Sequence, residues 1–348
     1  MKVLFVGGTG TISMAITRKM LSEGHEVYLV NRGNRNDELG NLNNLHRIVC
    51  DVNDEAAFKA AVDKAIGEDM FDSVCDFIGF IPEQVERDYR VFNGKTKQYM
   101  YISSASAYAK PVRNYVITEG TSLANPYWDY SRNKIACEEF LMKKYREEGY
   151  PVTIIRPSHT YDERSVPLGV HGNNGSYQVI KRMLEGKPII IQGDGTSLWH
   201  MTFNEDFAKG FTGLIGNNHA IGEAFQITND ETLTWNQIYE TIAQHLGVPF
   251  KPYYVASDFL AAVSDYDYTG SLTGDKSNSV VFDNSKLKSA VPGLNMNISF
   301  REGIGRTLDY VLTHPECQRE DPEFDAWCDK VIAGMEELKK KLSEKTVG

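Results

Sequence analysis

The chain has few of the features that mark secreted or membrane proteins. Its 348 residues include five cysteines, which are widely spaced and form no C-x-x-C pair. An odd number of scattered cysteines is typical of reduced core thiols, so a disulfide scaffold is excluded. The first apolar run covers only residues 3–6 before a glycine turn. We therefore expect no signal peptide or membrane span there, and a cytoplasmic protein.

Positive charge and metal or hydrolase motifs are also scarce. Lys and Arg number 37 against 47 Asp and Glu, giving a net charge of -10. This charge repels nucleic acid and anionic membranes, so neither is an expected partner. The eight histidines form no H-x-x-x-H pair and no G-x-S-x-G elbow occurs, so we expect no metal site and no serine hydrolase. The expected partner is a small-molecule substrate, with a homodimer left open.

What the chain does have is an alternation of apolar runs and amphipathic helical segments. This βαβ alternation predicts an α/β protein built on a Rossmann doubly wound parallel sheet. After about residue 160 the alternation loosens, which predicts a smaller mixed α/β substrate lobe. The strands of the predicted sheet cover residues 3–6, 25–30, 47–50, 73–78, 98–103 and 152–155.

The length of the chain fits two lobes at ~150 residues per domain. We expect residues 1–160 to form a Rossmann domain, a type of domain that commonly binds NAD(P). Residues 196–229 should return to it, because 224–228 has the pattern of one more sheet strand. Residues 161–195 and 230–348 should form the substrate-binding lobe and the C-terminal helices.

The glycine turn after the first strand predicts a seat for a dinucleotide. Gly7 permits the tight turn, and Gly10 lets the backbone approach a pyrophosphate at the N-terminus of the next helix. Thr11 precedes the helical pattern, which begins at Ile12. Ser13 stands where the usual pattern has a third glycine, which is a departure from the motif.

The end of the second strand bears on the choice of nicotinamide cofactor. Asn31, Arg32 and Arg35 stand there, without a carboxylate to bind a free ribose 2′-hydroxyl. The arginines suit a 2′-phosphate, so NADP is favoured over NAD. Asp51, followed by Val52 after the third strand, is placed to accept from the adenine amino group. The alternative role for Asp51 is the N-cap of the next helix.

The pattern Tyr-x-x-x-Lys, which can supply a proton donor beside a nicotinamide, begins at Tyr130 and again at Tyr177. The first copy opens a helix between two predicted sheet strands, so its side chains can reach the carboxyl edge of the sheet. Lys134 lies one turn beyond Tyr130, where its charge favours the phenolate. Tyr177 falls in an apolar stripe with Ile180 and Leu184, and we interpret this second copy as core.

Four parts of the chain, taken in order, resemble the extended short-chain dehydrogenase/reductases. They are the Gly-Gly-Thr-Gly turn, Ser-Ser-x-x-x-Tyr after the fifth strand, Tyr-x-x-x-Lys, and Arg-Pro at 156–157. Gly-Asp-Gly at 193–195, with 203–206 and 283–286, brings the chain closer to the NAD-dependent epimerase/dehydratase family. The resemblance implies hydride transfer at a secondary alcohol or ketone of a sugar or sugar-like substrate. A nucleotide-sugar epimerase and a non-catalytic cofactor-binding scaffold are the alternatives.

Carried over by position, the resemblance implies roles for individual residues. Ser104 would donate its hydroxyl to the substrate, Tyr130 would be the acid/base, and Lys134 would bind the nicotinamide ribose. The candidate cofactor-binding residues are Gly7, Gly10, Thr11, Ile12, Asn31, Arg32, Arg35, Asp51, Val52, Lys134, Pro157 and His159. The candidate substrate residues are Ser106, His159, Trp199 and His200.

Two departures from the family narrow the expected reaction. Ala105 and Ser106 stand where the dehydratases carry acidic residues, so a dehydratase is disfavoured. The segment after Gly-Asp-Gly reads Thr-Ser-Leu-Trp-His, without the arginine that nucleotide-sugar epimerases usually present there. We therefore expect a substrate smaller or less charged than a nucleotide diphosphate sugar. Otherwise Arg182 or Arg301 should replace the missing arginine. Epimerase and reductase are not separated by the sequence.

Overall fold

The computed structural model describes residues 1–33 and 38–344, which fall into two compact units. Each unit is assembled from several stretches of the chain. The first unit contains residues 1–161, 200–231 and 280–298, and the second contains 162–199, 232–279 and the residues from 299 onward.

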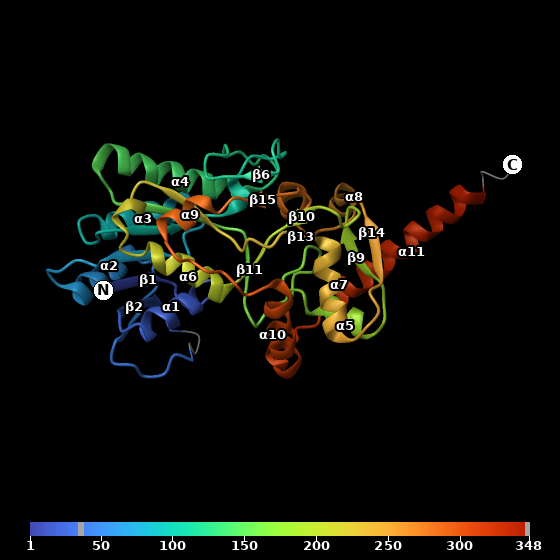
Figure 1. Cartoon of the computed structure of the whole chain (residues 1–348), viewed down its shortest axis with the longest axis horizontal. Coiled ribbons are helices and arrows are strands. Elements are labelled where there is room, and N and C mark those ends of the chain that lie inside the picture. The colour runs from blue at the N-terminus through green and yellow to red at the C-terminus, as the bar shows by residue number, and fades with distance from the viewer. Residues whose placement is uncertain (34–37, 345–348) are drawn as a thin grey trace. The chain divides into compact units, whose positions relative to one another are not determined.

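A parallel sheet forms the centre of the first unit (Figure 1). Strand order diverges on either side of β1, so β1 and β4 flank the switch point, beyond whose carboxyl ends ligands bind. The expected Rossmann doubly wound sheet is confirmed. Its seven strands are, in spatial order, β12 (Ala224–Ile227), β7 (Val152–Pro157), β5 (Tyr99–Ile102), β4 (Ser73–Asp76), β1 (Lys2–Val6), β2 (Glu26–Asn31) and β3 (Leu45–Val49).

Helices cover both faces of this sheet, which explains the unbroken apolar runs of its strands. Val3 and Phe5 of β1 pack on one face, and Leu4 and Val6 pack on the other. The first layer includes α1 (Ser13–Ser22), α6 (Asn204–Leu214) and α9 (Ser285–Ala290), and the second includes α2 (Glu55–Ile66), α3 (Pro82–Phe92) and α4 (Asp129–Glu148). The unit also holds η1 (Ala105–Ala107), β8 (His159–Tyr161), β11 (Met201–Phe203) and η2 (Asn218–Ala220).

Residues 280–298 lie in the first unit, although we expected them in the second lobe. Strand β15 (Val281–Phe282) pairs in parallel with β6 (Val116–Ile117). The Asn284 side chain donates to the Thr228 carbonyl at 2.7 Å. Strand pairing and a buried hydrogen bond therefore tie this segment to the sheet, despite its distance along the chain.

The second unit is a mixture of helices and short sheets. The role of this unit in binding substrate stays a prediction. Its strands are β9 (Ile189–Gln192), parallel to β14 (Pro252–Val255), and β10 (Leu198–Trp199), antiparallel to β13 (Leu233–Thr234). Its helices are α5 (Tyr177–Leu184), α7 (Trp235–Leu246), α8 (Ser257–Ala262), the π-helix η3 (Thr269–Lys276), α10 (Phe300–Thr313), η4 (Pro315–Cys317) and α11 (Pro322–Glu344). None of the helices in the described ranges has the length and hydropathy needed to cross a bilayer.

Candidate active site

The turn between β1 and α1 is built from glycines that have little room for a side chain. Gly7 and Gly8 have φ angles of 101° and 96°, which side chains disfavour. A Cβ on Gly8 would lie 2.6 Å from a methyl group of Leu29. The Gly10 amide donates to Ser13 Oγ at 2.9 Å. The serine that replaces the third glycine is therefore accommodated as a hydrogen-bonding partner of the turn.

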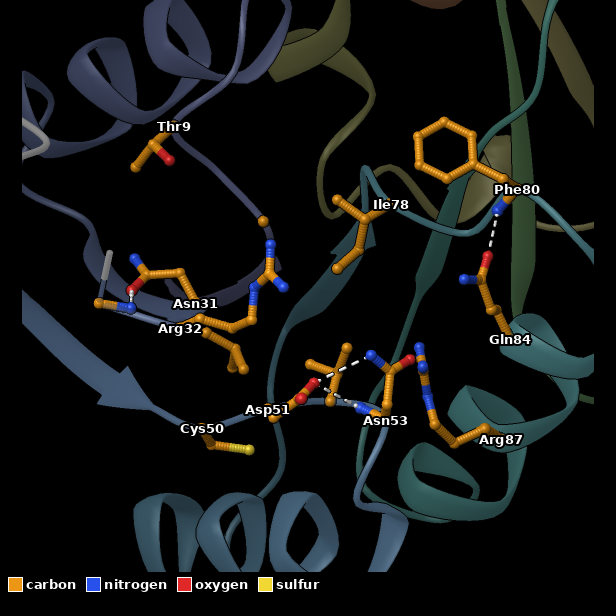
Figure 2. A pocket seen from close by; sticks show the side chains of 14 residues that line it. Thr9, Asn31, Arg32, Cys50, Asp51, Asn53, Ile78, Phe80, Gln84 and Arg87 are labelled. Carbon is orange, nitrogen blue, oxygen red and sulfur yellow. Dashed lines mark hydrogen bonds between the residues drawn. The ribbon is translucent and has the colours of Figure 1, made fainter. Parts of the chain in front are cut away.

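A pocket of about 400 Å³ lies beyond the carboxyl ends of β2 and β3, and we call it the β2–β3 pocket (Figure 2). Its lining includes the predicted residues Gly7, Asn31, Arg32, Asp51 and Val52. Figure 2 shows the Arg32 side chain reaching in from the end of β2. The structure thus brings together the residues predicted for the adenosine half of the cofactor. Arg35, also predicted there, lies outside the described residues.

Asp51 is not the N-cap of α2, which was the alternative role predicted for it. Its Oδ1 accepts from the backbone and side-chain nitrogens of Asn53, both at 3.0 Å. The N-cap of α2 is Asp54, whose side chain accepts from the Ala57 amide at 3.0 Å. Asp51 therefore faces the β2–β3 pocket with its carboxylate oriented by Asn53.

A second pocket of about 410 Å³, the β1–β5 pocket, lies beyond the ends of β1, β5 and β7. The two pockets share Gly7, Thr9, Ile78 and Phe80, so they adjoin each other around the glycine turn. The predicted residues that line the β1–β5 pocket are Gly7, Gly10, Thr11, Ile12, Ser104, Tyr130, Lys134 and Pro157. The structure therefore places the three predicted catalytic residues beside the glycine turn.

Lys134 is buried and held by two backbone carbonyls. Its Nζ donates to Gly79 O at 2.6 Å and to Ile102 O at 2.7 Å. Nζ lies 5.8 Å from the centre of the Tyr130 ring. Burial lowers the pKa of Lys134 to about 8, while the nearby charge of Asp76 opposes this shift. A cation one turn from Tyr130 favours its phenolate form.

Ser104 stands at the end of a chain of three hydroxyls. Its Oγ accepts from the Ser106 amide at 3.1 Å and lies 2.8 Å from Ser106 Oγ. Ser131 donates to Ser106 Oγ at 2.7 Å. When Ser106 in turn donates to Ser104, the Ser104 proton is left for a ligand. Ser106, predicted to touch substrate, is 3% exposed and bridges the two other serines instead.

Two hydroxyls test whether the β1–β5 pocket fits a nicotinamide cofactor. Within the described part of the chain, Ser103 Oγ and Ser158 Oγ are buried at this pocket without a hydrogen-bond partner. Buried polar groups are rarely left unsatisfied, so these two indicate a polar ligand. Together with the glycine turn at the N-terminus of α1, they form a site that fits a dinucleotide.

All four predicted substrate residues, Ser106 among them, are absent from the linings of the two pockets in the part of the chain that the structure describes. His159 lies on β8. Trp199 is buried in the second unit and stacks on Trp235, with ring centroids 5.6 Å apart. His200 is fully buried, and its Nδ1 donates to Asn229 O at 2.8 Å. Burial lowers the pKa of His200, so this ring is poorly suited to bind a phosphate as a cation.

The second Tyr-x-x-x-Lys copy lies on α5 in the second unit. Tyr177 donates to Gln318 Oε1 at 3.3 Å, and Lys181 pairs with Glu320 at 2.6 Å. Both side chains are thus engaged with the protein. The predicted apolar stripe is wrong at Leu184, which is 45% exposed. The buried residues of α5 are instead Gln178, Val179, Ile180, Arg182 and Met183.

Arg182 is buried and forms ion pairs within the protein. Its guanidinium pairs with Asp325 at 2.6 Å and with Asp329 at 2.8 Å on α11. With 1% of its side chain exposed, Arg182 cannot replace the arginine that the segment after Gly-Asp-Gly lacks. Arg301 lies on α10, where it contacts Gln244 at 3.4 Å.

Sequence reasoning missed the loop that follows β4 and the first half of α3. Ile78 and Phe80 line both pockets, and Gln84 and Arg87 line the β2–β3 pocket. Gln84 accepts from the Phe80 amide at 2.6 Å (Figure 2). The position of this loop could have identified it, because the loop follows the carboxyl end of the strand beside β1, where ligands bind at the switch point.

The parallel sheet, the glycine turn and the adjoining pockets define a Rossmann-type dinucleotide-binding protein. A family model described as the NAD dependent epimerase/dehydratase family matches residues 3–228. The chain belongs to this family, as its motifs predicted.

Several known proteins are similar to this chain. The 2′-dehydrokanamycin reductase of Streptomyces kanamyceticus is 23% identical over 261 residues, which cover 75% of this chain and 71% of the relative. The chloroplast stem-loop binding protein of 41 kDa b from Arabidopsis thaliana is 25% identical over 255 residues, which cover 71% of this chain and 64% of the relative. Among solved structures, UDP-glucuronic acid 4-epimerase from Bacillus cereus, in complex with UDP-glucuronic acid and NAD, has a TM-score of 0.70 at 17% identity. The match covers 90% of this chain and 99% of the epimerase chain. This structural likeness shows the shared fold.

Proposed function

We propose that the protein is an NAD(P)-dependent epimerase or reductase acting at a secondary alcohol or ketone of a sugar or sugar-like substrate. The observation that carries this proposal is the presence of Ser104, Tyr130 and Lys134 in one pocket with the glycine turn. When bound, the nicotinamide cofactor supplies the hydride acceptor or donor.

Each of the three residues has a distinct part in the proposed reaction. Tyr130 moves a proton at the reacting oxygen of the substrate, and its phenolate is favoured by Lys134. Ser104 donates its hydroxyl to that oxygen, oriented by Ser106 and Ser131. No Asp or Glu is found among the described residues lining the β1–β5 pocket, which supports a reaction without dehydration.

The role of Tyr130 is tested by substitution. We expect Tyr130→Phe to abolish turnover and to leave cofactor affinity nearly unchanged, because the lost hydroxyl acts only in proton transfer. Tyr177→Phe is the matched control and should retain activity. Turnover is measured by nicotinamide absorbance with the best sugar found in a screen. Reversed phenotypes would show that the wrong Tyr-x-x-x-Lys copy had been chosen.

We propose NADP as the preferred cofactor because Arg32 lines the β2–β3 pocket at the end of β2. A charge-assisted contact with a 2′-phosphate is worth ~1.5 to 3 kcal/mol, or roughly ten- to a hundredfold in affinity. Arg32→Ala should therefore weaken NADPH binding and leave NADH binding unchanged in fluorescence titrations. Arg90→Ala, which removes an exposed arginine of α3, is the control. Equal affinities of the native protein for the two cofactors would rule out the assignment.

We propose that the substrate lacks a nucleotide diphosphate. The segment after Gly-Asp-Gly has no arginine, and Arg182 is held by ion pairs. The name of the Streptomyces relative is that of a reductase of 2′-dehydrokanamycin, which is compatible with such a substrate. Calorimetry of the cofactor-loaded protein with UDP, GDP and dTDP should show no micromolar binding. Micromolar binding of any of these nucleotides would favour the alternative assignment, a nucleotide-sugar epimerase.

A second candidate function is a non-catalytic protein that binds the cofactor. The similarity to the chloroplast stem-loop binding protein favours it. Tight cofactor binding, together with no turnover across the sugar screen and specific binding of a stem-loop RNA, would support this candidate over the enzyme.

A further inference from the structure

Beneath the β1–β5 pocket, one phenol joins two buried carboxyl groups. Asp76 at the end of β4 and Asp88 on α3 are both fully buried. Tyr99 Oη lies 3.2 Å from Asp76 Oδ2 and 3.2 Å from Asp88 Oδ2. A phenol carries one proton and can donate to only one of them. The other contact becomes a hydrogen bond only when that carboxyl group is itself protonated and donates to Tyr99.

The remaining carboxylate oxygens already have donors. Asp76 Oδ1 accepts from the amides of Ile78 and Gly79, both at 2.9 Å. Asp88 Oδ1 accepts from Arg87 Nε at 2.8 Å and from a second Arg87 nitrogen at 2.5 Å. The Oδ2 atoms that face Tyr99 are therefore the places where a shared proton can lie.

Burial and mutual repulsion both favour retention of a proton by this pair. Burial raises the pKa of Asp76. Burial and the charge of Asp76 raise the pKa of Asp88 to about 8, despite the opposing charge of Arg87. The charge of Lys134 favours the ionised form of Asp76. The neutral member of the pair at pH 7 is accordingly Asp88.

Asp76 also fixes the backbone that holds Lys134. It binds the Gly79 amide, while the Gly79 carbonyl accepts from Lys134 Nζ. A Cβ on Gly79 would overlap the Asp76 carboxylate, so this close approach requires glycine. Tyr101 donates to the same carbonyl at 3.1 Å.

Other groups around Lys134 come from α4 and from the loop after β4. Lys134 Nζ lies 4.8 Å from the centre of the Phe80 ring, and Tyr130 faces it from α4. Cys137 and Glu138, also on α4, raise the pKa of Lys134 as Asp76 does, but by less. Asp76 is thus the main negative group acting on Lys134.

We propose that Asp76 is a positioning residue for Lys134, and that Asp76 and Asp88 hold one proton between them through Tyr99. The proton rests on Asp88 at neutral pH, which leaves Asp76 ionised beside Lys134. The ionised carboxylate keeps Lys134 charged and holds the Gly79 carbonyl in place. This inference rests on the proposed function, because it specifies how the lysine beside the acid/base is maintained.

The test is the titration of Lys134 in the full-length protein without substrate. Lysine-selective ¹³C NMR follows its Cε signal with pH, and the signal is assigned with Lys134→Arg. Asp76→Asn should lower the midpoint by about one pH unit or more, a tenfold loss of proton affinity. Asp88→Asn is an equally conservative change in the same cluster and should not lower it. An unchanged midpoint in Asp76→Asn, or the same lowering in both variants, would overturn the proposal.

A second measurement keeps the proposal testable if Asp76→Asn does not fold. Infrared spectra of the native protein at neutral pH should contain the band of a protonated carboxyl group, which Asp88→Asn removes and the exposed control Asp69→Asn retains. Absence of that band from the native protein would contradict the shared proton. Neither measurement uses turnover, so failure here leaves the Tyr130→Phe test of the proposed function untouched.

Discussion

At the residue scale, the hydroxyl chain ending at Ser104 makes Ser131 a sensitive position. Ser131→Ala removes one hydrogen bond from Ser106 and so loosens the orientation of Ser104. A neutral hydrogen bond contributes ~0.5–1.5 kcal/mol, so we expect kcat to fall by up to about tenfold with little change in KM or cofactor affinity. Ser131→Thr should restore the rate, and Ser22→Ala, an exposed serine of α1, is the control. A rise in KM at constant kcat would contradict this role.

Gly8 is the residue of the turn where added bulk is least tolerated. Gly8→Ala combines a positive φ with a close approach to Leu29, whereas Gly24→Ala has a φ of 79° and meets no atom within 4 Å. Strained backbone conformations cost about 1–3 kcal/mol. We expect Gly8→Ala to lower the free energy of unfolding in urea more than Gly24→Ala does. Equal losses would mean that the turn relaxes around the methyl group.

At the scale of elements, a buried ion pair ties β7 to α4, the helix that carries Tyr130 and Lys134. Arg156 donates to Glu138 at 2.9 Å and 2.6 Å, and both side chains are buried. Removing one partner of such a pair costs about 3–5 kcal/mol because the other charge stays buried. Arg156→Met should lower the urea midpoint accordingly. The control Arg90→Met breaks an exposed pair with Glu55 and should cost at most about 1 kcal/mol.

The elements also show how far the sequence could predict the structure. The strands were predictable because helices bury both sheet faces, so most strand residues are apolar. β4 ends at Asp76, two residues earlier than predicted, because its carboxylate binds the amides of Ile78 and Gly79. Ser104 could be placed because it adjoins a predicted strand end, and Tyr130 because it opens a helix between two predicted strands. The burial of Trp199 could not, because it depends on Trp235, which is distant in the sequence.

At the scale of the whole molecule, the Asp76–Asp88 pair gives stability a pH dependence. The folded pKa of Asp88, about 8, lies above its ordinary value of 3.8, so the native state binds a proton that the unfolded chain releases. Its contribution to stability is present below about pH 4 and is lost as pH rises towards 8. One proton corresponds to ~1.4 kcal/mol per pH unit. Between pH 5 and 8, the stability of Asp88→Asn should fall less steeply in urea unfolding than that of the native protein. Parallel slopes would contradict this assignment.

The repeated passage of the chain between its units limits how the protein can be divided or recombined. The passages follow residues 161, 199, 231, 279 and 298. A fragment ending at residue 161 would lack β12, α6 and α9, leaving β7 as a bare sheet edge and only α1 of the three helices on one sheet face. A single crossover between genes therefore cannot exchange the second unit intact.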